Sequence, residues 1–234
     1  MKKTGILQFP GSNCDGDVFK ALKSFSLKPV TEQIVYKNTV TAFQDACWPE
    51  LLKSSDTIEI KNYKAFIVPG GFSYGDYLRA GALARFSPAM KDLIRAGQKG
   101  WPILGICNGF QILCESGLLE GALLPNKQGR FLDEWSDLKL ENQNAFWPSL
   151  SGEIKLPIAH GEGSYYIPQD QLNKLRDNSQ VWISYQNNPN GSVENIAGVM
   201  NKKGNVAGLM PHPERAVADW MGGTDGLSFF QNLC

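Results

Sequence analysis

The first half of the chain alternates short apolar segments with segments whose apolar residues recur at helical spacing. The apolar runs have the length of buried strands, and the amphipathic segments have the length of ordinary helices. This alternation predicts βαβ units, and therefore a mostly parallel sheet with helices on both of its faces. Strands are expected at residues 5–9, 29–36, 64–71 and 101–107, and helices at residues 17–26, 86–100 and 108–117.

The pattern changes after residue 125. Apolar runs such as 181–186 and 205–210 look like strands, and turn dipeptides rather than long amphipathic segments separate them. We therefore expect antiparallel strands added to the same sheet. The 234 residues contain no internal repeat, low-complexity tract or linker, so residues 1–234 are expected to form a single α/β domain.

Three loops that follow predicted strands are rich in glycine. In an open α/β sheet, ligands bind beyond the carboxyl ends of the strands, and glycine lets a backbone turn sharply or approach a ligand closely. These loops are therefore the candidate binding site. Their sequences are FPGSNCDGD (9–17), VPGGFSYGDY (68–77) and GICNGF (105–110).

The third loop has the pattern Gly105-x-Cys107-x-Gly109 between a predicted strand and a predicted helix. It is the thiol counterpart of the G-x-S-x-G nucleophile elbow, in which glycines relieve clashes around a strained central residue. At the usual thiol pKa of about 8.5, only about 3 per cent is ionised at pH 7, so a nucleophilic Cys107 needs an activating partner. The competing interpretation is a buried structural cysteine whose glycines serve only the turn.

Only His160 and His212 are available as that partner. His212 follows the strand-like segment 205–210 and precedes a proline, which favours extended backbone, so Glu214 would point to the same side. A carboxylate placed there orients the imidazole and leaves the second ring nitrogen for the thiol. His160 has Glu162 at the same spacing, and spacing alone leaves both histidines open.

Composition excludes several classes of protein. Lys plus Arg and Asp plus Glu number 23 each, so there is no basic field and nucleic acid is not an expected partner. Gln8 and Pro10 interrupt the first apolar stretch, and no segment approaches the length of a membrane span. Five scattered cysteines indicate neither a disulfide framework nor a zinc site, and no metal site is expected. We therefore expect a reduced, cytoplasmic protein.

A more specific signal comes from five segments in a fixed order, which are VPGGFSYGDYLRAGALA (68–84), GICNGFQIL (105–113), PIAHGEG (157–163), NPNGS (188–192) and GLMPHPER (208–215). They resemble the glutaminase subunits of phosphoribosylformylglycinamidine synthases, which are class I, or triad, glutamine amidotransferases of purine biosynthesis. G-x-C-x-G and H-x-E are shared across triad amidotransferases, whereas GGFSYGDYLR, HGEG and NPNGS are typical of this family. The resemblance extends from Gly5 to Leu233 and implies a flavodoxin-like sheet.

The resemblance also implies how the site works. Glutamine would be hydrolysed to glutamate and ammonia through a thioester on the cysteine. The backbone N–H groups of Asn108 and Gly71 would stabilise the oxyanion, and Gly70 would belong to the same substrate-binding turn. The implied triad consists of Cys107 as nucleophile, His212 as base and Glu214 as its orienting partner.

In this family the ammonia passes to a separate synthetase subunit, which uses ATP and magnesium to convert formylglycinamide ribonucleotide to the amidine. The sequence contains no G-x-x-x-x-G-K-[ST] motif and no acidic cluster typical of magnesium, so no cofactor is expected in this chain. Because 234 residues leave no room for a fused synthetase, we expect a free-standing subunit. Its expected partners are glutamine and the synthetase, and an additional small subunit is left open.

Three alternatives remain open from the sequence. Another triad amidotransferase subunit would share the chemistry but supply a different acceptor. A cysteine hydrolase or chaperone of the same architecture would keep the elbow cysteine without needing H-x-E after a late strand. A non-catalytic binding module would use these loops only as a scaffold.

Overall fold

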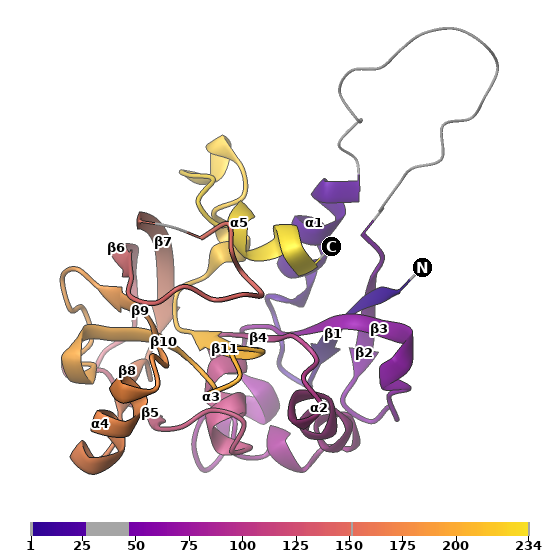
Figure 1. Cartoon of the computed structure of the whole chain (residues 1–234), viewed down its shortest axis with the longest axis horizontal. Helices are drawn as coiled ribbons and strands as arrows, with labels where there is room; N and C mark the ends of the chain where they lie inside the picture. The colour runs from indigo at the N-terminus through magenta and orange to yellow at the C-terminus, as the bar shows by residue number, and fades with distance from the viewer. Residues whose placement is uncertain (1, 27–46, 151, 234) are drawn as a thin grey trace, which may run out of the picture.

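The computed structural model describes residues 2–26, 47–150 and 152–233. Its main sheet has nine strands in the order β2-β1-β3-β4-β11-β10-β9-β6-β7 (Figure 1). The first five of these strands run parallel to one another. They are β2 (Pro49–Lys53), β1 (Lys3–Gln8), β3 (Tyr63–Val68), β4 (Ile103–Ile106) and β11 (Val206–Leu209).

The other four strands extend the sheet in antiparallel fashion. A short turn between β10 and β11 explains the change, because a tight connection can only join antiparallel neighbours. A second, two-stranded sheet pairs β5 (Ala122–Leu124) with β8 (Ser164–Tyr166). The four added strands are β10 (Ile196–Met200), β9 (Val181–Tyr185), β6 (Leu132–Leu140) and β7 (Glu153–His160).

Helices cover both faces of the parallel part of the sheet (Figure 1). α1 (Asp15–Ser26) and α5 (Leu227–Phe230) lie on one face, and α2 (Pro88–Gln98) and α3 (Asn108–Glu115) lie on the other. α4 (Gln169–Asp177) lies beside the small sheet. The short 3₁₀ helices are η1 (Ile60–Asn62), η2 (Ser73–Asp76), η3 (Ala84–Phe86), η4 (Val193–Asn195), η5 (Pro213–Arg215), η6 (Asp219–Met221) and η7 (Gln231–Leu233).

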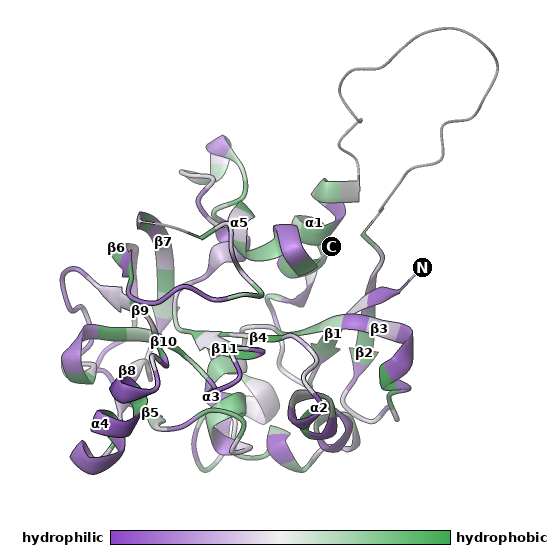
Figure 2. Ribbon diagram, viewed as in Figure 1, coloured by the Kyte–Doolittle hydropathy of each residue, from purple (hydrophilic) through white to green (hydrophobic). Residues whose placement is uncertain are grey.

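Burial follows strand position in the sheet. All residues of the central strands β4, β10 and β11 are buried. In β6, by contrast, Leu132, Ser136 and Leu138 are buried and the residues between them are exposed. Strands covered on both faces must be apolar on both faces, and Figure 2 shows the central strands in green. The antiparallel half has its own aromatic cluster, in which Trp182 lies 5.3 Å from Trp147 and 5.5 Å from Phe229 between ring centroids. This cluster fixes α5 against the sheet.

The predicted mostly parallel sheet with later antiparallel strands is confirmed. The strand expected at 29–36 lies outside the described residues, and β2 is a described strand that the hydrophobic pattern did not identify. The later half also contains α4, where only strands and turns were expected. Burial of Leu172 and Leu175 gives α4 a narrow apolar face, which the many polar residues of this segment hid.

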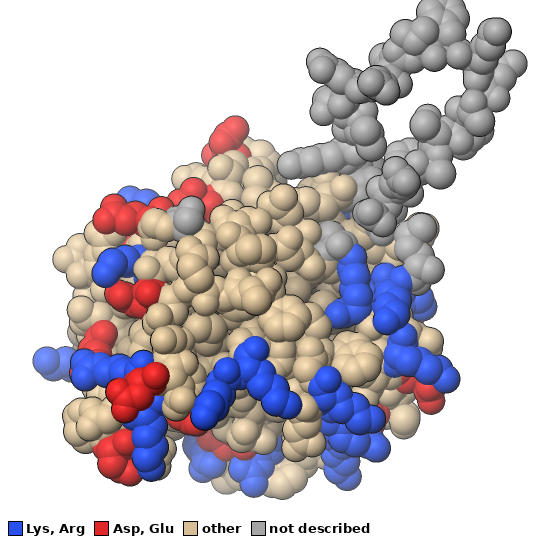
Figure 3. Space-filling model, in the orientation of Figure 1, with Lys and Arg blue, Asp and Glu red and all other residues tan. Residues whose placement is uncertain are grey.

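Two further observations concern the chemistry of the whole chain. Cys47 is disulfide-bonded, which the expectation of a fully reduced protein did not anticipate, whereas Cys14, Cys107 and Cys114 are free thiols. No helix among the described residues is long and apolar enough to span a membrane. On the face shown in Figure 3, basic side chains gather over β1, β3 and α2, and acidic side chains lie mostly over the antiparallel half.

Candidate active site

Cys107 occupies the turn between β4 and α3, as the glycine pattern predicts. Its backbone angles are φ 50° and ψ −107°, a strained conformation that a non-glycine residue adopts only when the surrounding structure enforces it. The flanking glycines allow this turn because a Cβ on Gly109 would lie 1.8 Å from the carbonyl oxygen of Val68. A Cβ on Gly105 would lie 2.5 Å from the Leu113 side chain. The elbow therefore needs glycine at both positions.

His212 and Glu214 lie just beyond the end of β11 and are both 1% exposed. The Nδ1 atom of His212 is 2.6 Å from Oε1 of Glu214. The expected extended geometry is wrong, because Pro213–Arg215 forms the 3₁₀ helix η5 and brings the carboxylate back to the ring. The backbone N–H of His212 also donates to the carbonyl of Pro157, which ties this turn to β7.

The surroundings of His212 favour its protonated form. Burial by itself lowers the pKa of His212, but the Glu214 carboxylate and the Cys107 thiol beside the ring outweigh burial and hold the pKa well above its usual value. With Nδ1 engaged by Glu214, Nε2 has no partner among the described residues. Nε2 is therefore the atom that accepts a proton from Cys107, and the raised pKa of His212 stabilises the ring once it carries that proton. The sulfur of Cys107 lies 3.7 Å from the carbonyl oxygen of Ala159.

Three loops converge closely at this point. A Cβ built on Gly70 would lie 2.9 Å from Cε1 of His212, 3.0 Å from Sγ of Cys14 and 3.5 Å from Cβ of Cys107. Gly70 therefore keeps space for the imidazole, and the substrate binding that the resemblance implies for Gly70 stays a prediction. Gly71 has φ 146° and lines the cavity beside Cys107.

The two implied oxyanion donors come from different loops of the chain. Asn108 is the first residue of α3, so its N–H is among those that no carbonyl of the same helix accepts. The Asn108 side chain accepts a hydrogen bond from the N–H of Ser73 (3.1 Å) and donates to Asp76 (3.2 Å) and Gln111 (2.8 Å). This amide couples the loop that carries Gly71 to the nucleophile turn.

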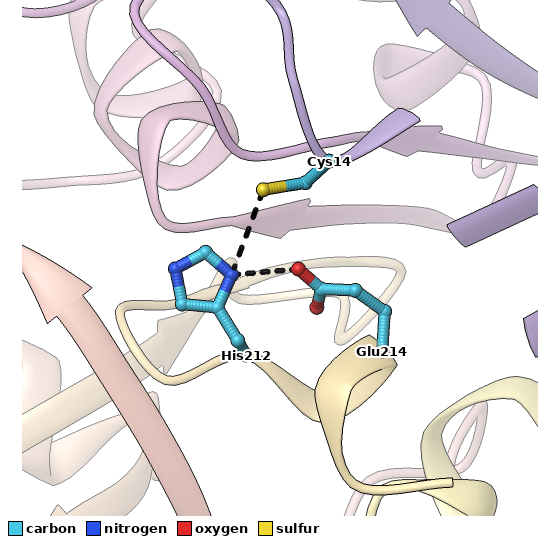
Figure 4. Close-up of side chains that lie close together, drawn as sticks. All are labelled: Cys14, His212 and Glu214. Atoms are coloured by element: carbon cyan, nitrogen blue, oxygen red, sulfur yellow. Dashed lines mark hydrogen bonds and ion pairs between the residues drawn. The ribbon is translucent and has the colours of Figure 1, made fainter. Parts of the chain in front are cut away.

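Cys14 is a part of the site that sequence reasoning missed. Its buried sulfur is 4.0 Å from Nδ1 of His212 and accepts a hydrogen bond from Nη2 of Arg215 at 3.2 Å (Figure 4). The signal was the glycine-rich loop after the first strand, which was expected at the same sheet edge. Cys14, His212 and Glu214 place ligand atoms within 4.8 Å of one another, as a metal site requires. The positive charge of the Arg215 guanidinium, which donates to this sulfur, would repel a metal cation bound there. These residues therefore fit a proton-transfer site better than a metal site.

His160 differs from His212 in its environment. Nδ1 of His160 is 3.1 Å from Oδ1 of Asn126, and no carboxylate is bonded to the ring among the described residues. Burial, followed by the charge of His212, lowers the pKa of His160 to about 4. His160 is therefore neutral at pH 7 and lines the cavity without the charge-stabilising partner that a base requires.

The cavity in front of Cys107 holds about 240 Å³. Besides the residues already described, its wall includes Asp76, Gln111, Glu162 and the rings of Phe72 and Phe131. A buried thiol, a base held by a carboxylate and backbone donors beside the thiol make up the arrangement that acyl transfer through a thioester needs.

Comparison with known proteins identifies glutamine amidotransferases that this chain resembles. Residues 1–225 match the family model of the CobB/CobQ-like glutamine amidotransferase domain. The chain is 40% identical to a chain in the structure of PurLQS from Thermotoga maritima, with a TM-score of 0.82, and the match covers 100% of this chain and 98% of that one.

Two more distant structures share the fold. A putative GMP synthase component from Thermoplasma acidophilum is 14% identical, with a TM-score of 0.59 and coverage of 100% of this chain and 92% of that chain. A glutamine amidotransferase from Thermotoga maritima is 15% identical, with a TM-score of 0.55 and coverage of 92% and 77%. With a family match over nearly its whole length, the chain belongs to the CobB/CobQ-like glutamine amidotransferases.

Proposed function

We propose that this chain is the glutaminase subunit of phosphoribosylformylglycinamidine synthase. The observation that carries the chemistry is the buried His212–Glu214 pair against the strained elbow that bears Cys107. The 40% identity to the PurLQS chain over its full length supports this particular member of the amidotransferases. The GGFSYGDYLR, HGEG and NPNGS segments of the sequence point to the same member.

The reaction follows from the positions of the groups. His212 takes the proton of Cys107, and the thiolate attacks the side-chain amide carbon of glutamine. The N–H groups of Gly71 and Asn108 stabilise the oxyanion that forms. His212 then protonates the departing nitrogen, and ammonia leaves a thioester on Cys107. His212 next activates water, which releases glutamate and restores the thiol.

The ammonia serves a second active site on another subunit. We propose that a synthetase subunit binds ATP and magnesium and converts formylglycinamide ribonucleotide to the amidine, and that this chain itself needs no cofactor. The absence of a phosphate-binding G-x-x-x-x-G-K-[ST] motif from the sequence supports this division of labour. A cytoplasmic location, where the nucleophile stays reduced, is part of the same proposal.

Replacing Cys107 by alanine tests this function directly. In the reconstituted synthase, Cys107→Ala should abolish amidine formation from glutamine and leave formation from added ammonia nearly unchanged, because only ammonia release uses the thiol. Cys114→Ala is the matched control, since Cys114 lies on the same helix and donates to the carbonyl of Glu120 away from the cavity. Glutamine-supported turnover by a folded Cys107→Ala protein would contradict the assignment.

A further inference from the structure

Two carboxylates lie in the cavity wall without a cation to pair with. Asp76 is the last residue of η2, and Glu162 follows the end of β7, so they come from separate loops. Among the described residues, neither carboxylate forms an ion pair with a lysine or arginine. Burial, followed by the negative charge of Glu162, raises the pKa of Asp76 to about 6, because both disfavour the ionised form of Asp76.

His160 independently indicates which kind of group binds in this cavity. The Asn126 amide is fixed because its nitrogen donates to the carbonyls of Arg130 and His160, so its oxygen faces Nδ1 of the ring. Nδ1 must therefore carry the ring proton, which leaves Nε2 as an acceptor. This atom is buried and has no partner among the described residues, and His160 lines the same cavity. The occupant must bring N–H donors.

The position of these acceptors is tied to the nucleophile. Asp76 accepts a hydrogen bond from Nδ2 of Asn108, the residue directly after Cys107. Glu162 is held through its backbone carbonyl, which accepts from Nε2 of Gln111 at 2.6 Å. Both anchoring amides belong to α3, so the Asp76 carboxylate and the backbone of Glu162 are bonded to the helix that begins at the thiol.

We infer that Asp76 and Glu162 form the subsite for the α-ammonium group of glutamine and thereby select an amino acid over other primary amides. The inference rests on the proposed function, in which glutamine is the substrate. Its α-ammonium is the cationic group of glutamine and has three N–H donors, which matches the charge and the acceptors of this wall. Binding it neutralises the repulsion between the two acids.

The test compares glutamine with 4-carbamoylbutanoate, which is glutamine without the α-ammonium group. In the synthase complex, we expect Asp76→Asn and Glu162→Gln each to lower kcat/KM for glutamine by about 10- to 100-fold, mainly through KM, as loss of a charged hydrogen bond predicts. Both variants should leave kcat/KM for the analogue within about threefold of the wild-type value. The preference of the enzyme for glutamine over the analogue should therefore be largely lost. Asp170→Asn, on the exposed side of α4, is the matched control and should change kcat/KM for neither substrate.

The outcomes separate this inference from the proposed function. Equal loss of activity on both substrates, with Cys107 still alkylated by iodoacetamide at the wild-type rate, would assign the acids a structural role and overturn the subsite. Thermal unfolding of the complex that carries Cys107→Ser provides a second check. The subsite would be wrong if MgCl₂ raised its Tm, glutamine did not, and Asp76→Asn removed the effect of MgCl₂. If neither substrate were hydrolysed by the wild-type complex, the glutaminase function itself would fail.

Discussion

At the scale of single residues, the two histidines near Cys107 are separated by their partners. His212 donates to a buried carboxylate that stabilises an imidazolium, whereas His160 faces an amide oxygen and stays neutral. A general base must carry the proton it accepts, so the carboxylate partner decides between them. Cys14 also lies beside Nδ1 of His212, and Arg215 donates to its sulfur.

Replacement of each histidine should therefore have different consequences. His212→Ala should lower the rate of glutamine hydrolysis by about 10²- to 10⁴-fold, as is typical for loss of a general base. His160→Ala should lower kcat by a smaller factor than His212→Ala does. Mass spectrometry after treatment with an alkylating glutamine analogue provides the check, because labelling of Cys107 should depend on His212. Labelling that survives His212→Ala but is lost in His160→Ala would exchange their roles.

Asp76 should make stability depend on pH in a defined direction. Its pKa of about 6 in the folded chain exceeds the usual 3.8, so folding favours the protonated carboxyl. This contribution to stability is complete at low pH and is lost as the pH rises through about 6. Asp76→Asn removes the titrating group and keeps an oxygen for Nδ2 of Asn108.

We expect Asp76→Asn to raise Tm above that of the wild type at neutral pH, and the difference to shrink to zero as the pH falls to about 4. Thermal unfolding across this pH range measures the effect, with Asp170→Asn as the exposed control. A difference in Tm that stays constant with pH would show that the carboxyl does not titrate as proposed. A gain in stability at the expense of glutamine binding is common for functional residues.

At the scale of elements, the nucleophile turn depends on how closely α3 approaches β3 and β4. The helix begins directly after Cys107, so a shift of its first turn moves both the thiol and the N–H of Asn108. The closeness is set by glycine, since Gly109 leaves no room for a side chain against the backbone of Val68. Packing and catalysis are therefore coupled at this turn.

Gly109→Ala should destabilise the fold by about 1–3 kcal/mol and slow alkylation of Cys107, because the new methyl group must displace backbone. Gly16→Ala is a matched control in α1, where an added Cβ meets nothing within 4 Å. That change should be neutral or stabilise by up to about 1 kcal/mol. Chemical denaturation of both variants measures the contrast, and equal effects would contradict the packing argument.

At the scale of the whole molecule, the strand order brings the site together. β1, β3, β4 and β11 are successive parallel neighbours, so their carboxyl ends meet at one edge and deliver Cys14, Gly70, Cys107 and His212. The edge also exposes apolar groups, since Tyr77 is 73% and Leu78 89% exposed on the loop that carries Gly71 and Asp76. We expect this loop to respond to the synthetase subunit.

The isolated chain should therefore be a weak glutaminase. Titration with synthetase and its substrates should raise glutamate release tenfold or more, because docking favours the loop arrangement in which both oxyanion donors point at the substrate. Each tenfold gain corresponds to about 1.4 kcal/mol of preference for that arrangement. Tyr77→Ala should weaken the activation without changing alkylation of Cys107. Full activity without a partner would refute the coupling and leave the triad intact.

Local features of this protein could be read from its sequence alone. Strand and helix periods, the elbow around Cys107 and the H-x-E pair depend on residues close in the chain, and local patterns record them. Spacing alone left open which histidine is the base, and only the family resemblance pointed to His212. Sequence reasoning also missed Cys14 and the acidic pair of Asp76 and Glu162. These depend on side chains that meet only when distant strands align, because strand order and register arise from packing of the whole core. Which of the candidate groups face one another was therefore settled only in the folded chain.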